Sequence, residues 1–175
     1  MKSILAGFAL LVLVSSSQAQ SNYDDLTQIG NSVKQEITKS MHGWTYRSVK
    51  PIQGSDGVIL QQWELNNIIV RVSITRYDDA AKAQLAFKQF EEQKKQEEEA
   101  TSKNRHKSVH LIKEKLSFMG DEGVVTDIRG SEAVAFRKGK FIVNVSVPQP
   151  ANNKDVFFSR QFAHHVLKAI EDKKD

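Results

Sequence analysis

Two segments of the chain alternate apolar and polar residues in nearly the same way. In Phe141–Val147 the apolar side chains fall at every second position, and Ile68–Ile74 repeats this pattern in register. A period of two with β-branched residues is typical of a strand that buries one face. Each segment follows a tight-turn sequence and precedes an amphipathic helical pattern. We therefore expect one β-hairpin-plus-helix unit used twice, in halves of about residues 44–100 and 108–172.

Three other stretches place apolar residues three and four positions apart, which is the spacing of one face of a helix. They cover about residues 24–38, 79–99 and 155–171. In the second stretch the apolar residues end at Phe90, and Glu91–Glu99 is almost wholly charged or amide. We expect this part to be a solvated helical extension, supported only by weak ion pairs between residues four positions apart.

The alternating segments and the turn sequences between them predict about seven strands in two consecutive runs. The expected strands cover about residues 44–49, 58–65, 68–76, 109–116, 124–128, 132–136 and 141–147. Adjacent hairpins with few helices between them favour an antiparallel sheet in an α+β domain. One clean apolar face predicts that the helices cover one side of the sheet, with the second and third helices side by side. If the unit is duplicated, Val70 and Val143 should occupy equivalent places on that side.

The first 19 residues have the three parts of a secretory signal peptide. Lys2 supplies the charge, Ile4–Val14 is the apolar core, and Ser17 and Ala19 are small residues before the cleavage position. This core is shorter than the roughly 20 residues that span a bilayer, and the chain has no cysteine for lipid attachment. We expect cleavage after Ala19 and an exported domain of residues 20–175, periplasmic or extracellular, without a membrane anchor.

The charge and the catalytic motifs limit the possible functions. The formal net charge of +4 is spread along the chain, which favours solubility over nucleic-acid binding. Without cysteine there is neither a thiol nucleophile nor a disulfide, and no phosphate loop or nucleophile elbow is present. The adjacent His164 and His165 point in different directions on a helix and so do not form a metal pair. We therefore expect no metal and no cofactor.

Four aromatic residues in the first half are the candidate surface for a ligand or partner. Trp44, Tyr46, Trp63 and Tyr77 are suited to lining a concave site for an apolar ligand or a partner peptide. Packing in the core against the first helix is the alternative interpretation of these aromatic residues, and it is the one we favour. The leading hypothesis is a non-enzymatic exported module that binds a protein partner or a small ligand.

Two alternatives make different demands on the fold. An exported hydrolase would need at least two of His42, His110, Asp121 and Glu122 to meet in one cleft. A carrier of an apolar ligand would need an enclosed cavity between sheet and helices, lined by residues such as Trp63 and Phe136.

One local pattern resembles a known group of proteins. The sequence Gly120-Asp-Glu-Gly123, followed by Glu132-Ala-Val-Ala-Phe-Arg-Lys-Gly139 and an alternating strand, resembles small bacterial exported or lipoprotein-type α+β domains of unknown function. The resemblance implies a fold and an exported location but no activity. This chain lacks the lipoprotein cysteine that many of those domains carry.

Overall fold

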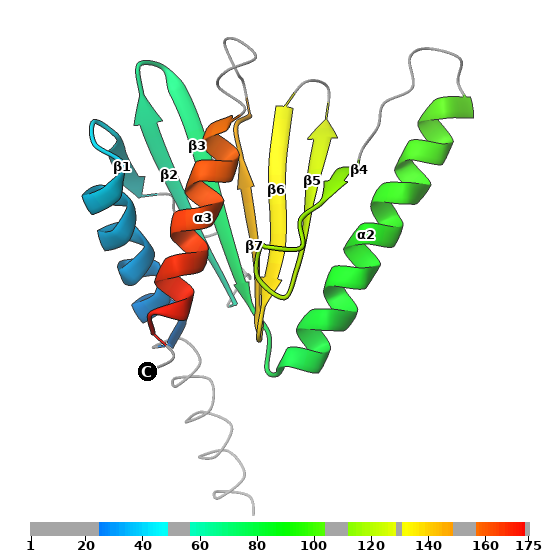
Figure 1. The fold of residues 1–175 in the computed structure, drawn as a ribbon, viewed down its shortest axis with the longest axis horizontal. Coiled ribbons are helices and arrows are strands. Elements are labelled where there is room, and N and C mark those ends of the chain that lie inside the picture. The colour runs from blue at the N-terminus through cyan, green and yellow to red at the C-terminus, as the bar shows by residue number, and fades with distance from the viewer. Residues whose placement is uncertain (1–24, 49–56, 104–111, 129–130, 149–156, 174–175) are drawn as a thin grey trace, which may run out of the picture.

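A single antiparallel sheet of seven strands organises the molecule (Figure 1). The computed structural model describes residues 25–48, 57–103, 112–128, 131–148 and 157–173. The elements are a first helix (residues 25–40), β1 (Thr45–Ser48), β2 (Val58–Leu65), β3 (Ile68–Arg76), α2 (Ala80–Lys103), β4 (Ile112–Lys115), β5 (Glu122–Ile128), β6 (Ser131–Lys138), β7 (Phe141–Ser146) and α3 (Phe157–Glu171). The strand order is β1-β2-β3-β7-β6-β5-β4. The predicted α+β class with a seven-stranded antiparallel sheet is confirmed.

Tight turns set the register of the two hairpins. Asn66 and Asn67 have positive φ angles of 48° and 69°, the backbone geometry of a type I′ turn, and join β2 to β3. Gly139, with φ of 56°, helps to turn β6 into β7. The two alternating segments of the sequence are β3 and β7, which pair with each other at the centre of the sheet.

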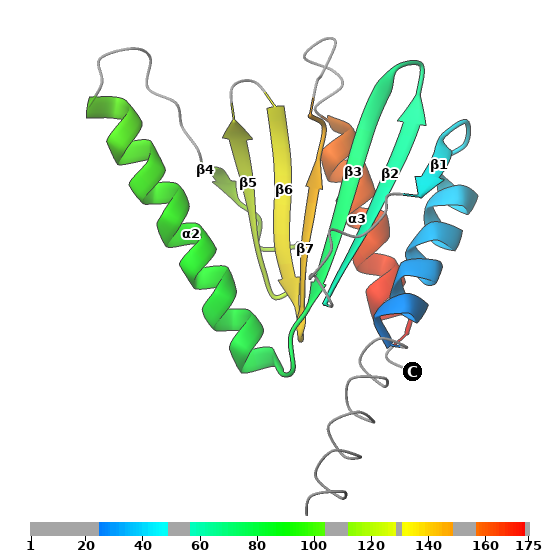
Figure 2. The ribbon, with the colours of Figure 1, turned by 180° about the vertical axis from the view of Figure 1, so that it is seen from behind.

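The main core lies between the sheet and two helices, the first helix and α3, which lie side by side on one face (Figures 1 and 2). Val70 and Val143 both face this core and are fully buried, as expected for the two hairpins. The first helix lies close to β2. The Gln61 side chain of β2 donates a 2.7 Å hydrogen bond to the Gly30 carbonyl of that helix. A Cβ atom at Gly30 would lie 2.8 Å from Ile59.

The expectation that all helices cover one face is wrong for α2. Phe87 of α2 is fully buried against Val124 and Ala135. Their strand neighbours Val125 and Val134 belong to the main core, so Phe87 packs on the opposite face of the sheet. The first helix occupies the place beside α3, and β5 and β6 offer α2 a second apolar surface. The repeat is therefore not confirmed for the complete hairpin-plus-helix unit.

The second half of α2 leaves the sheet. Asp79 caps the helix, as expected, by accepting a 2.7 Å hydrogen bond from the Lys82 N–H. The C-terminal half of the helix leans away from the strands in both views (Figures 1 and 2). Glu91 lies 3.4 Å from Lys115 of β4 rather than in the expected pair with Lys95. The solvated extension predicted from the charged sequence is thus part of a continuous helix.

Candidate functional site

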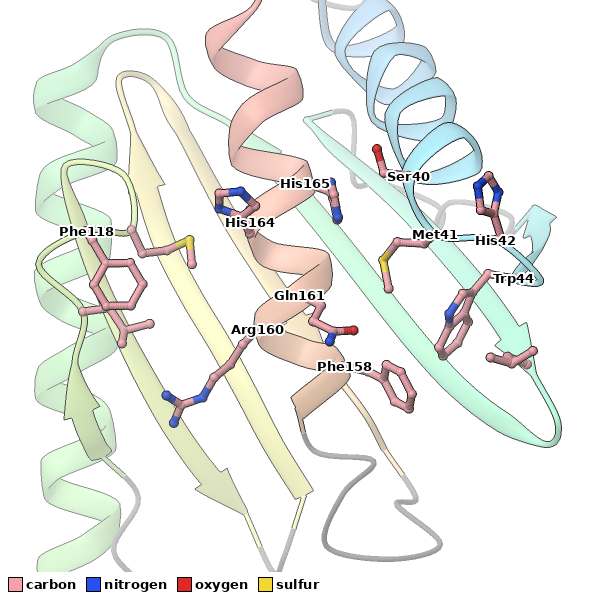
Figure 3. Close-up of a pocket in the computed structure, with 13 residues that line it drawn as sticks. Ser40, Met41, His42, Trp44, Phe118, Phe158, Arg160, Gln161, His164 and His165 are labelled. Atoms are coloured by element: carbon pink, nitrogen blue, oxygen red, sulfur yellow. The ribbon is translucent and has the colours of Figure 1, made fainter.

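A pocket of about 730 Å³ opens around the outward side of α3, on the face that the first helix also covers (Figure 3). Its lining comes from three separate parts of the chain: the end of the first helix with the adjoining strand ends, the β4–β5 loop, and α3. The residues are Ser40, Met41, His42, Trp44, Leu65, Leu116, Phe118, Met119, Phe158, Arg160, Gln161, His164 and His165. We call this pocket the α3 basin.

Trp44 forms a rigid wall of the α3 basin. Its side chain is 9% exposed, and its ring meets Phe158 at 5.0 Å and Phe162 at 4.8 Å between centroids, both edge to face. Edge-to-face contacts stabilise aromatic pairs beyond their buried area. The Trp44 ring is therefore held in place by α3 and offers only an edge of its surface to the pocket.

The other three aromatic residues predicted for the site do not line the basin. Tyr46 meets Trp63 at 5.1 Å between ring centroids, and Trp63 is fully buried and shares Phe162 as a neighbour with Trp44. Tyr77 follows the far end of β3, where its N–H donates to the Lys140 carbonyl. The structure therefore brings Trp44, Tyr46 and Trp63 together, as both core and support, and separates Tyr77 from them.

The β4–β5 loop supplies apolar groups that the sequence reasoning missed. Leu116 and Met119 are buried, whereas Phe118 between them is 70% exposed and lies at the basin (Figure 3). The segment Leu116-Ser-Phe-Met119 looks like the start of a turn because Gly120 follows it. The available signal was the cluster of large apolar residues, Leu116, Phe118 and Met119, directly before a turn glycine.

Three of the six polar or charged residues that line the basin are histidines. His42 and His164 are exposed, and His165 is half-buried with its ring centroid 5.7 Å from that of His164. His42 and His164 lie on opposite sides of the basin (Figure 3). The residues that line the basin in the described part of the chain include no carboxylate.

Glu36 joins the first helix to α3 beside the basin. One of its carboxylate oxygens lies 2.9 Å from Lys168 Nζ, 2.9 Å from Ser40 Oγ and 3.2 Å from His165 Nδ1. The hydrogen bond from Lys168, helped by those from Ser40 and His165, lowers the pKa of Glu36 to about 2 although burial opposes the shift. Glu36 therefore stays charged and holds the two helices together.

Arg160, which lines the basin, belongs to a second cluster of ion pairs. Its Nε lies 3.1 Å from Glu132 and its Nη1 3.0 Å from Glu114. Glu132 is buried and also accepts a 3.1 Å hydrogen bond from Ser159. The bond to Glu132, followed by that to Glu114, raises the pKa of Arg160 above its usual value. The guanidinium thus links α3 to β4 and β6.

Two of the residues proposed for a hydrolase, Asp121 and Glu122, lie together, but no described histidine joins them. Asp121 and Glu122 lie 2.8 and 3.3 Å from the guanidinium of Arg137. They sit at the start of β5 by a different pocket, whereas His42 lies at the α3 basin. His110 is outside the described residues.

The described residues form neither the cavity of a carrier nor a metal site. A carrier would need an enclosed cavity lined by residues such as Trp63 and Phe136. The basin is instead open to solvent, and Trp63 and Phe136 are fully buried and do not line it. Across the described ranges, no three His, Asp or Glu side chains are grouped as metal ligands.

No protein-family model, curated protein or solved structure matches the chain. The helices within the described ranges include none that is long and apolar enough to cross a membrane. The geometry of the α3 basin is therefore the main evidence on which a function can be argued.

Proposed function

We propose that this chain is an exported, non-enzymatic α+β module that binds the apolar part of a small ligand or of a protein partner in the α3 basin. One observation carries the proposal: an open pocket of about 730 Å³ has an exposed phenylalanine, Phe118, opposite a rigid aromatic wall at Trp44. Small-molecule pockets have volumes of roughly 300–1,000 Å³ and are lined mostly by apolar groups.

The energetics of the lining favour binding. Phe118 is 70% exposed, and covering such a side chain stabilises a complex by about 1–2 kcal/mol. Met41 and Met119 are flexible and can adjust to the shape of a ligand. Trp44 and Phe158 are fixed by their ring contact, so little conformational entropy is lost there on binding.

The surroundings of the acidic residues support binding rather than catalysis. Asp121 and Glu122 are bonded to Arg137, a buried side chain that needs these partners. Such carboxylates serve the fold and are poorly placed to act as acid or base on a substrate. The hydrolase alternative would need Asp121 and Glu122 to act on a substrate despite these bonds to Arg137.

Export is the second part of the proposal and rests on the signal-peptide features of residues 1–19. We expect the mature protein to start near Gln20 and to be recovered from the periplasm or the medium. Intact-mass measurement of the exported form checks the cleavage position. Recovery of membrane-bound protein that still carries Met1 would contradict it.

The binding site is tested with N-phenylnaphthylamine, an uncharged dye that fluoresces in apolar surroundings. Phe118→Ser should weaken dye binding about fivefold or more, because it removes the most exposed apolar group of the basin. Leu85→Ser is the matched control, since Leu85 is also exposed, at 59%, but lies on α2. Equal affinities of the two variants would exclude the α3 basin as the site.

The two tryptophans give an independent readout. Trp44 lines the basin whereas Trp63 is fully buried, so in a Trp63→Phe variant the indole emission reports on the basin alone. We expect the dye to quench this emission by energy transfer with the same midpoint as the rise in dye fluorescence.

A further inference from the structure

The fixed charges next to the α3 basin are paired within the protein. Arg160 is bonded to Glu132 and Glu114, a cluster with one excess negative charge, and Glu36 is bonded to Lys168. These groups are held at 2.9–3.1 Å from their partners, and none of the three carboxylates lines the pocket. A positive charge that attracts an anion to the lining must therefore come from other groups.

Histidines are those other groups. His42 and His164 line the basin and are exposed, and within the described ranges neither forms an ion pair with a carboxylate. His165 lies beside His164 and is bonded to Glu36. Histidine side chains exchange a proton between about pH 5 and 8. Protonation of His42 and His164 thus adds positive charge that no carboxylate of the lining offsets.

Resting on the proposed function, we propose that the α3 basin binds a small amphipathic anion: an apolar body with one carboxylate, sulfonate or phosphate group. The apolar body contacts Trp44, Phe118 and Phe158, and the anionic group faces His42 or His164. The complex is tighter at the acidic end of the range in which histidine titrates.

The same lining argues for a small molecule over a membrane surface. Binding to anionic membranes relies on clusters of Lys and Arg near the surface. The lining contains no lysine, and its single arginine, Arg160, is bonded to two carboxylates. The apolar groups also line a concave pocket whose volume is that of a small-molecule site.

The charged groups near the two histidines set the size of the expected pH effect. On α3, Arg160 precedes and Lys168 follows His164 by one turn; Glu36 faces His165 from the first helix, and Glu114 and Glu132 face α3 from β4 and β6. Because all but the histidines are paired, the pH effect comes from the histidines. An exposed pair is a weak interaction, so we expect anion affinity to rise about fivefold in total from about pH 8 to about pH 5.5.

The test compares two dyes with the same ring system. Anilinonaphthalene sulfonate carries a sulfonate that stays ionised over this pH range, and N-phenylnaphthylamine lacks it. The measured quantity is the ratio of the two affinities for the full mature protein at each pH. We expect this ratio to rise about fivefold on acidification, and to lose most of that rise in the double variant His42→Gln with His164→Gln.

Lys88→Gln is the control for net charge, because Lys88 is exposed on α2 and lines a different pocket. This variant should not change the pH dependence of the ratio of the two dye affinities. A ratio that is constant with pH, or one that responds equally to Lys88→Gln, would overturn the anion proposal while binding of the uncharged dye still supports the basin. Absence of binding by either dye would overturn both proposals. Pelleting with anionic vesicles but no binding of the soluble sulfonate would overturn the assignment to a small molecule.

Discussion

Arg137 and Asp121 join two turns at one end of the sheet. Arg137 Nη1 donates to Asp121 Oδ2 at 2.8 Å, and the same oxygen accepts the N–H of Gly139 at 2.8 Å. The N–H of Asp121 donates in turn to the Arg137 carbonyl. Gly120 has φ of 70°, and a Cβ there would lie 2.4 Å from that carbonyl oxygen. The Gly-Asp-Glu-Gly turn and the Arg-Lys-Gly turn are therefore one structural unit.

Replacing Asp121 with alanine should destabilise the protein by about 2 kcal/mol. The change removes a charged partner of Arg137, whose residue is only 8% exposed, and leaves the N–H of Gly139 without its acceptor. Chemical denaturation measures the loss. Asp78→Ala is the control, because Asp78 pairs with Lys82 at the surface, and such pairs contribute about 0–1 kcal/mol. Equal effects of the two changes would show that the Arg137 unit does not stabilise the fold.

Glu36 should make stability depend on acidic pH. Its pKa is lowered in the folded protein, from a usual value of 4.5 to about 2. The stabilisation is therefore fully present above about pH 4.5 and is lost as the pH falls toward 2. We expect Glu36→Gln to destabilise the protein by about 1–2 kcal/mol at neutral pH and to make little difference near pH 2. Unfolding curves at several pH values check this; a difference that does not change with pH would contradict it.

Phe87 should anchor α2 to the sheet. Its side chain is fully buried between α2 and the strands, against Val124 and Ala135. Phe87→Ala should therefore cost about 3 kcal/mol in unfolding free energy. Leu85→Ala on the same helix should change it by less than about 0.5 kcal/mol, because Leu85 is exposed. Similar losses for the two variants would mean that α2 packs differently from the arrangement in Figure 1.

The charged end of α2 should open locally without unfolding the domain. Its last apolar contacts with the sheet are made by Phe87 and Phe90, and the ion pair of Lys94 with Glu97 joins two residues of the helix itself. We expect backbone amides of residues 93–103 to exchange with solvent much faster than those of Ile68–Ile74 and Phe141–Val147. Hydrogen exchange by mass spectrometry measures both. Slow exchange in residues 93–103 would instead indicate that this end of α2 is covered by a partner.

The hairpins could be predicted because their signals are local. The turn at Asn66-Asn67 and the alternation of Ile68–Ile74 specify β2, β3 and their buried face within a few residues. The face of the sheet on which α2 packs could not be predicted in this way. It depends on a second apolar surface formed by Val124 of β5 and Ala135 of β6. The run Ala133-Val-Ala-Phe136 is the one hint, since a strand covered on both faces loses its alternation.

The candidate site was predictable only in part for a similar reason. Trp44 stood out as a large aromatic residue, but its neighbours in the α3 basin come from the distant segments 116–119 and 158–165. Phe118 resembles a turn residue and His164 an exposed helix residue when each is considered in its own segment. Only the packing of α3 between the first helix and the β4–β5 loop brings them around one pocket.

The pairing of β3 with β7 has a consequence for the order of folding. These strands form the centre of the sheet, with Val72 opposite Val145, yet nearly half the chain separates them. Such long-range pairings raise the contact order and slow the folding of a chain. Synthesis must be almost complete before the sheet can close and α3 can cover it. A chain with this topology stays unfolded for longer, which is compatible with the export proposed above, because a narrow channel admits only an unfolded chain.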